Sequence, residues 1–466
     1  MRNLKYDTKT LWQMDHDHYV HPWTDFSSFK EQGSEIIADS EGIYVYDSDG
    51  QRYIDGIGGL WCVNIGYGRD EMAQAIAEQA RRICYYSTFT HITTPPAAEL
   101  AAKLAALAPG PLNHVFYTTG GSESNDVAVR TIHYYFNRLG KKSKKKIIAR
   151  IDGYHGSTLL TATITGVMFD RIGFDTIDDL VHHIPCPNPY RRPDGMTLEA
   201  FGDQCIADIE NKILELGPEN VAMFFAEPIM GAGGVIVPPP GYHRRAQEVC
   251  NKYDVIYVSD EVVTAFGRLG HFFASKDRFD LQPDIISTAK GITSGYQPLG
   301  AMIFSDKIYE VISVPQEKGA MFTNGFTYSG HAVTCAAGVK NIEIMEREDI
   351  CGHVRKVGPY FEKKLKEGMG DLPIVGDIRG SHFMLCAEYV ADRKTKALLP
   401  PEANIGGRIA RIAKSKGAIV RPIGHLNVLS PPLTMTTGQI DDLVGILRAS
   451  TLAAMDELKR DKLWNG

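Results

Sequence analysis

Residues 259–300 read SDEVVTAFGRLGHFFASKDRFDLQPDIISTAKGITSGYQPLG, and the rest of the chain is organised around this stretch. Asp260 follows an apolar run typical of a buried strand, residues 255–258, and Lys290 follows a second such run, residues 284–289. An Asp and a Lys at the carboxyl ends of two strands lie where open α/β sheets bind their ligands. Desolvation at that place would favour the neutral, nucleophilic amine of the lysine. The alternative is a surface lysine paired with a carboxylate.

The length and composition predict a globular protein of two or three domains. Of its 466 residues, 44% are hydrophobic and 23% charged, and the net charge of −6 gives no reason to expect nucleic-acid binding. The eight cysteines form no CxxC pair, so neither a metal site nor a disulfide framework is predicted. The N-terminus lacks the apolar segment of a signal peptide, and no apolar run reaches membrane-spanning length. We therefore expect a cytoplasmic protein that binds no membrane.

Short apolar runs alternate with helical segments from about residue 70 to residue 325. Continuous apolar runs are expected when helices cover both faces of a parallel sheet, and this alternation predicts a doubly wound α/β domain. A hairpin signature around Asp49-Gly50 precedes this region, and strands are expected after it at residues 381–385 and 418–420. The runs that predict the sheet are residues 115–117, 146–150, 221–225, 255–258, 285–287 and 301–304.

We predict three segments along the chain. Residues 1–69 form an N-terminal arm and hairpin that belong to a small domain. Residues 70–328 form the large domain, and residues 329–466 form the C-terminal part of the small α+β domain.

The sequence TTGGSE at residues 118–123 follows a strand and opens a helix. The free N–H groups and the positive dipole end of a helix bind anions such as phosphate, and Ser122 adds a hydroxyl. The motif is neither a Walker A loop nor a dinucleotide fingerprint. The alternative is an ordinary helix N-cap at Ser122.

Two more motifs lie just after predicted strands. Tyr154, between glycines in GYHGST, is placed to lie flat over a planar ligand, although it could instead pack on a turn. The role of the adjacent His155 stays open. Glu227, in AEPIMGAGG, puts a carboxylate at the same edge of the sheet.

These motifs together provide a phosphate cradle, an aromatic plate, carboxylates and a lysine. Pyridoxal 5'-phosphate (PLP) needs this set, because it carries a phosphate, a planar ring, a ring nitrogen that works best protonated, and an aldehyde that condenses with a lysine. Asp260 fits the partner of the ring nitrogen, and Lys290 fits the Schiff-base lysine.

Seven motifs in order between about residues 20 and 450 resemble the class III PLP-dependent aminotransferases, most closely the omega-amino acid and amine:pyruvate branch. The resemblance implies the PLP-dependent transferase fold of type I, with a mainly parallel mixed sheet in the large domain. It also implies a homodimer, possibly a tetramer, with active sites at the interface. Ala265 departs from the family pattern, which usually has Gly there. The motifs are TGGSESND, DGYHGST, FFAEPIMGAGG, SDEVVTAFGRLG, PDIISTAKGITSGYQPLGA, NGFTYSGHAV and IVRPIGHLNVLSPPL.

The resemblance implies a role for each matching residue. Lys290 would be the Schiff-base lysine and proton carrier, and Asp260 would pair with the ring nitrogen. Arg421 would bind a substrate carboxylate through its planar fork and swing aside for amines that lack one. Further cofactor-binding residues would be Gly121, Ser122, Tyr154, Val262 and, from the other subunit, Thr327. Pocket-lining residues would be Trp23, Trp61, Phe89 and Ala232.

The expected activity is transfer of an amino group from a primary amine or omega-amino acid to an oxo acid, with pyruvate as the expected acceptor, by a ping-pong mechanism. One alternative is another PLP-dependent reaction on the same fold, such as that of an aminomutase, racemase or decarboxylase. A binding or regulatory protein that keeps the fold without turnover is the other. The donor stays open between β-alanine, taurine, 4-aminobutyrate, a polyamine and an aryl-alkyl amine.

Overall fold

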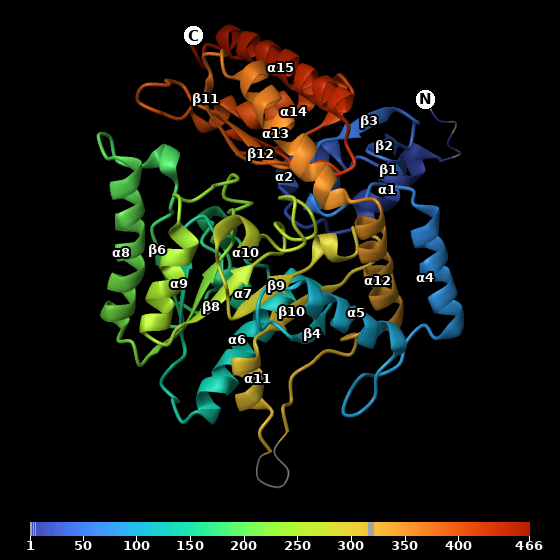
Figure 1. Cartoon of the computed structure of the whole chain (residues 1–466). Coiled ribbons are helices and arrows are strands. Elements are labelled where there is room, and N and C mark those ends of the chain that lie inside the picture. Colours follow the sequence, from blue (N-terminus) through green and yellow to red (C-terminus); the bar gives the residue numbers. More distant parts are fainter. Residues whose placement is uncertain (1, 3, 5, 316–320) are drawn as a thin grey trace.

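A computed structural model describes residues 2, 4, 6–315 and 321–466 (Figure 1). Its largest sheet has seven strands in the order β4-β10-β9-β8-β7-β5-β6. The strands β5 to β9 pair in parallel, whereas β10 is antiparallel to both β4 and β9, so the sheet is mixed and mainly parallel, as predicted. The strands are β4 (His114–Thr118), β5 (Lys146–Arg150), β6 (Val181–Ile184), β7 (Val221–Ala226), β8 (Ile256–Asp260), β9 (Ile285–Thr288) and β10 (Gly300–Phe304).

Helices cover both faces of this sheet and make a three-layer core. Successive side chains of a strand point to opposite faces. Met223 and Phe225 of β7 therefore pack in one cluster with helix α6 (Gly121–Arg138), while Phe224 packs with α8 (Leu198–Leu216) and α9 (Tyr242–Lys252) on the other face. Burial on both faces explains why the strands are continuously apolar.

A second sheet joins the two ends of the chain. Strands β1 (Ile37–Glu41), β2 (Tyr44–Asp47) and β3 (Arg52–Asp55) are antiparallel neighbours, which confirms the predicted hairpin. Strand β13 (Ala418–Ile419) then pairs in parallel with β3. Figure 1 shows the blue N-terminal strands beside the orange and red C-terminal helices, above the large sheet.

The third sheet has the order β11-β12-β15-β14 and lies in the C-terminal part. It corrects one prediction in part, because residues 381–385 are divided between two strands and do not form a single one. They span the turn between β11 (Val375–Ser381) and β12 (Met384–Tyr389), where His382 has a φ of 53° and reverses the chain. The strand predicted at residues 418–420 is present as β13, which covers residues 418 and 419. The chain then changes sheets and continues as β14 (Arg421–Ile423). The last strand is β15 (Leu426–Leu429).

The remaining helices surround these sheets. Within the described residues, no helix has both the length and the apolar character that crossing a membrane requires. The domain boundaries given above stay a prediction. The helices are α1 (Thr8–His18), α2 (Phe26–Gln32), α3 (Gly58–Trp61), α4 (Asp70–Arg82), α5 (Pro95–Leu107), α7 (Leu159–Ile164), α10 (Ala274–Phe279), α11 (Asp306–Ile312), α12 (Ala332–Arg347), α13 (Ile350–Met369), α14 (Ile405–Ser415) and α15 (Thr437–Arg460).

Candidate active site

Asp260 and Lys290 lie at one edge of the large sheet. Asp260 is the last residue of β8 and is in register with Ser287 of the parallel neighbour β9, which ends one residue later. Lys290 follows two residues beyond that end, at the start of a 3-10 turn. Its φ of 46° is a conformation that residues with a side chain seldom adopt, and such strain is concentrated at functional sites.

Burial lowers the pKa of Lys290, and the nearby Asp260 carboxylate opposes this shift only in part. The lysine side chain therefore deprotonates more readily than an exposed one. A neutral amine is the form that attacks a carbonyl carbon or accepts a proton from carbon. This is the form that the predicted nucleophilic role of Lys290 requires, and that role stays a prediction.

The Asp260 side chain is buried and held by three neighbours. Its Oδ2 accepts a hydrogen bond from Nδ2 of Asn125 (2.8 Å) and lies 2.8 Å from Nδ1 of His155, and its Oδ1 accepts the backbone N–H of Val262 (3.1 Å). Asn125 and His155 are also buried. The sequence predicted neither contact, because these residues lie 135 and 105 positions from Asp260; the one available signal was the histidine in GYHGST.

The N-terminus of α6 lines a cavity of about 400 Å³, together with residues 119–123, Ser157 and Thr158. Ser122 Oγ accepts the backbone N–H of Ser157 (3.1 Å), so the two motifs meet. A Cβ built on Gly121 would lie 2.8 Å from Cγ2 of Val262, so the glycine allows this valine to sit against the cradle. Because the helix start offers unpaired N–H groups, a phosphate fits this cavity.

Tyr154 is anchored beside this cradle. Its backbone N–H donates to Oε1 of Glu227 (3.0 Å), and its hydroxyl lies 2.9 Å from Oγ of Ser157. Its ring lies 5.8 Å from that of Trp23, centroid to centroid. Glu227 also accepts the N–H of Gly231 (2.8 Å), so one buried carboxylate positions both the tyrosine segment and the turn after β7.

The other predicted pocket residues come from several elements. Arg421 opens β14 and is half-buried, and burial lowers its pKa while Tyr154 and Asp170 act in the opposite direction. Trp61 is buried, with 4% of its surface exposed, in a cluster with the third sheet. Ala232 is half-buried, in the turn after Glu227.

Phe89 and Thr327 form a separate group on two adjoining loops. The hydroxyl of Tyr85 donates to the carbonyl of Thr327 (2.8 Å), and a Cβ built on Gly325 would lie 3.7 Å from the Phe89 ring. Both predicted residues are exposed. Within the described part of the chain, no hydrogen bond, ion pair or ring contact joins them to the cradle.

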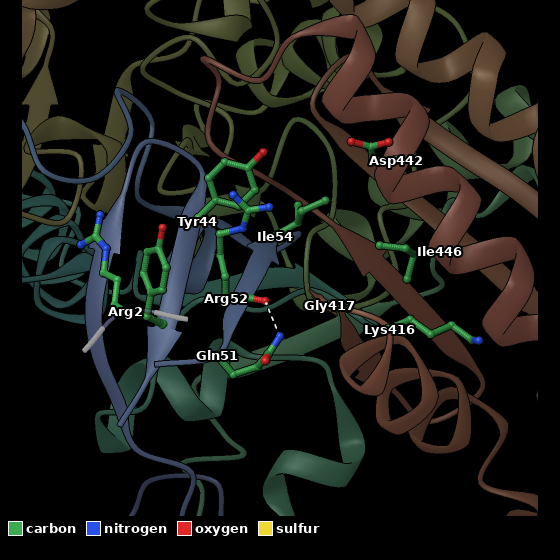
Figure 2. A pocket seen from close by; sticks show the side chains of 10 residues that line it. Arg2, Tyr44, Gln51, Arg52, Ile54, Lys416, Gly417, Asp442 and Ile446 are labelled. Carbon is green, nitrogen blue, oxygen red and sulfur yellow. Dashed lines mark hydrogen bonds between the residues drawn. The ribbon is translucent and has the colours of Figure 1, made fainter. Parts of the chain in front are cut away.

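A larger cavity of about 650 Å³ lies elsewhere, between the N-terminal sheet and α15 (Figure 2). None of the predicted site residues lines it. Arginine side chains cover tyrosine rings here, with Arg52 4.5 Å from the ring centre of Tyr44 and Arg2 4.2 Å from that of Tyr46. Of these two cavities, the smaller one is lined by predicted cofactor-binding residues, Gly121 and Ser122, and it is therefore the candidate active site.

Comparisons with known proteins show which family the chain belongs to. The sequence matches the family Aminotransferase class-III over residues 29–450. It is 40% identical over 440 residues to a putrescine--pyruvate aminotransferase of Pseudomonas aeruginosa, covering 94% of this chain and 95% of that protein.

Solved structures give the same result. An (S)-enantioselective omega-transaminase from Thermomicrobium roseum superposes with a TM-score of 0.92 at 38% identity, covering 97% of this chain and 99% of that one. The omega transaminase of Pseudomonas jessenii, solved in complex with PMP, superposes with a TM-score of 0.92 at 37% identity, covering 97% and 98%. The predicted fold is therefore confirmed, and the chain belongs to the class III aminotransferases, which depend on PLP.

Proposed function

We propose that this aminotransferase takes the amino group of a primary amine or an omega-amino acid and transfers it to pyruvate. The observation that carries the proposal is the placement of Asp260 and Lys290 at one sheet edge beside the α6 cradle. The relative that is named for putrescine and pyruvate supports the choice of donor class and acceptor.

The residues at this edge fit PLP. The helix start and Ser122 offer donors to its phosphate, and Asp260 offers its carboxylate to the ring nitrogen. The fully buried His155 side chain lies 2.8 Å from the Asp260 carboxylate through Nδ1, so the group that would pair with the ring nitrogen is fixed in place. When bound, PLP supplies an aldehyde and an electron-withdrawing ring.

Each protein group then has a defined task. Lys290 Nζ takes the proton from the amine-bearing carbon of the donor, which needs the neutral amine that burial favours. Asp260, held by Asn125 and His155, keeps a proton on the ring nitrogen. Arg421 binds the carboxylate of the oxo acid through two parallel hydrogen bonds.

The remaining side chains shape the site. Tyr154, anchored to Ser157, is proposed to stack on the cofactor ring, and Val262, packed at Gly121, is proposed to lie against the opposite ring face. Trp23, Trp61 and Ala232 are proposed to limit the size of the donor, whereas Phe89 is proposed to line the site of the partner subunit.

We further propose a homodimer in which each subunit completes the other's site. Phe89 and Thr327 lie apart from the cradle of their own chain, on loops that expose large apolar side chains. Exposed apolar groups of this kind mark contact surfaces. The exposed side chains there are Tyr86, Phe89, Ile92, Met321 and Tyr328.

Mixed dimers test this arrangement. In the proposed dimer, each site takes Lys290 from one subunit and Thr327 from the other. The variants Lys290→Ala and Thr327→Asp should therefore both be inactive. A mixed dimer of the two variants would contain one native site. Recovered activity on mixing supports a shared site, and a monomeric mass or no recovery contradicts it.

A cytoplasmic location is proposed as well, because all eight cysteines are unpaired.

A donor panel tests the activity itself. The enzyme is incubated with each amine and either pyruvate or 2-oxoglutarate, and the amino acid formed is quantified. One alanine formed for each donor consumed supports transamination to pyruvate. Preference for 2-oxoglutarate overturns the acceptor, and donor conversion without amino-acid formation points to an aminomutase, racemase or decarboxylase. A protein that binds PLP but converts no amine would be a binding or regulatory protein.

A further inference from the structure

The turn that begins at Lys290 is strained. Two of its residues, Lys290 and Ser294, have φ values of 46° and 50°, which residues with a side chain seldom adopt. Such conformations persist only where the surrounding structure fixes them. The support that keeps Lys290 in this conformation therefore has to come from residues packed around the turn.

One buried side chain, that of Asn341 on α12, bonds to three residues of this turn. Its Nδ2 donates to the carbonyls of Gly291 (2.9 Å) and Ile292 (3.1 Å), and its Oδ1 accepts the hydroxyl of Ser294 (2.6 Å). Asn341 is 0% exposed and Ser294 is 1% exposed, and an unmade hydrogen bond is costly in such surroundings. The three bonds therefore constrain the residues that come first, second and fourth after Lys290.

A second set of buried residues confines the same turn. A Cβ built on Gly291 would collide with the side-chain amide of Asn64 and would lie 2.9 Å from Cβ of Phe266. Asn64 is itself fixed, because its Nδ2 donates to the carbonyl of Phe266 (2.7 Å) and its Oδ1 accepts Nη2 of Arg268 (2.8 Å). This set limits the turn by close packing, whereas Asn341 bonds directly to its carbonyl groups.

We propose that Asn341 is a positioning residue for Lys290. By fixing the carbonyls of the two residues that follow the lysine, it holds the Lys290 backbone at its left-handed φ and so sets the direction in which the side chain leaves the chain. The inference rests on the proposed role of Lys290 as the residue that bonds to PLP. Asn341 acts through the lysine, and no contact with the cofactor is assigned to it.

Two forms of the cofactor distinguish this role from a general effect on folding. The aldehyde carbon of PLP bonds to Nζ of Lys290 and the aldehyde oxygen leaves as water, whereas pyridoxamine 5'-phosphate (PMP) carries an amine there and forms no such bond. Both forms have the same ring and the same phosphate. A misplaced lysine should therefore weaken the binding of PLP alone, whereas a distorted cradle would weaken the binding of both.

The variant Asn341→Asp keeps the shape of the side chain and puts an oxygen in place of the Nδ2 that faces two carbonyls. We expect the dissociation constant of the apoenzyme for PLP to rise about tenfold, because two buried hydrogen bonds are lost, and that for PMP to change less than twofold. Ser294→Ala removes one of the three bonds and should act in the same direction by a smaller factor. It carries the test if Asn341→Asp does not fold. Asn427→Asp is the matched control, since this buried asparagine donates to the carbonyl of Gly406 (3.1 Å) and its replacement should change neither constant.

The variant Lys290→Ala completes the test. It cannot form the bond to PLP, so adding Asn341→Asp in this background should weaken PLP binding no further. Equal weakening of PLP and PMP binding by Asn341→Asp, no weakening of either, or a further loss in the Lys290→Ala background overturns the inference. If Lys290→Ala by itself leaves PLP binding unchanged, the proposed role of Lys290 is refuted first, and the inference about Asn341 is refuted with it. The choice of amine donor and acceptor does not affect these binding measurements.

Discussion

Replacing Gly121 with alanine should weaken cofactor binding, whereas the same replacement at Gly120 should not. The new Cβ at Gly121 would lie 2.8 Å from Cγ2 and 3.0 Å from Cγ1 of Val262, both too close for carbon atoms. A Cβ at Gly120 would have nothing within 4 Å, and its φ of −169° suits any residue. Two adjacent glycines thus provide a test and its control.

The size of the effect follows from the contact. Overpacking by a methyl group costs about 1–3 kcal/mol. In the free protein, we expect the half-buried Val262 side chain to have room to turn and relieve the contact. With a cofactor ring against it, the valine has no such freedom, so most of the cost falls on binding. The dissociation constant of PLP should therefore rise about 5- to 150-fold, at 1.4 kcal/mol for each factor of ten.

The assay is a titration of the apoenzyme with PLP, followed by the absorbance of the bound cofactor. The melting temperature of the apoenzyme is measured in parallel and should change little. Combining Gly121→Ala with Val262→Ala removes the methyl groups that collide and should recover most of the affinity relative to Val262→Ala alone. Equal weakening by Gly120→Ala, or no recovery in the double variant, would refute the reasoning.

Three further predictions concern Lys290, Asp260 and His243. Lys290→Ala should abolish turnover and the absorbance of lysine-bound cofactor; a variant that keeps both would exclude Lys290 from the mechanism. Asp260→Asn should lower kcat about 100-fold or more, as loss of a preorganised electrostatic contact does, and near-normal turnover would contradict its role. Burial lowers the pKa of His243 from 6.5 to about 3. Between these pH values the unfolded state binds a proton that the folded state does not. The free energy of unfolding should therefore fall by up to about 1.4 kcal/mol for each pH unit as the pH drops from 6.5 toward 3. His243→Gln should make this acid-side slope shallower in denaturant melts, and an unchanged slope would assign the acid sensitivity to other groups.

The strand ends were predictable because their signals are local. Continuous apolar runs mark strands buried on both faces, and parallel strands place their carboxyl ends at one edge. From this pattern the sequence predicted that Asp260, Lys290 and the α6 cradle lie close together, and it indicated PLP as the cofactor. The single strand predicted at residues 381–385 is two strand ends joined by a turn, because a left-handed residue, His382, reverses the chain inside an apolar run and composition does not reveal it.

What the sequence by itself determined is therefore the α/β alternation, the sheet edge with its lysine and carboxylate, and the class of cofactor. Only the tertiary structure decided which groups hold Asp260 in place and that Phe89 and Thr327 lie apart from the cradle of their own chain. These relations join residues that are distant in sequence. They are set by how whole layers pack against one another, and no local periodicity records that packing.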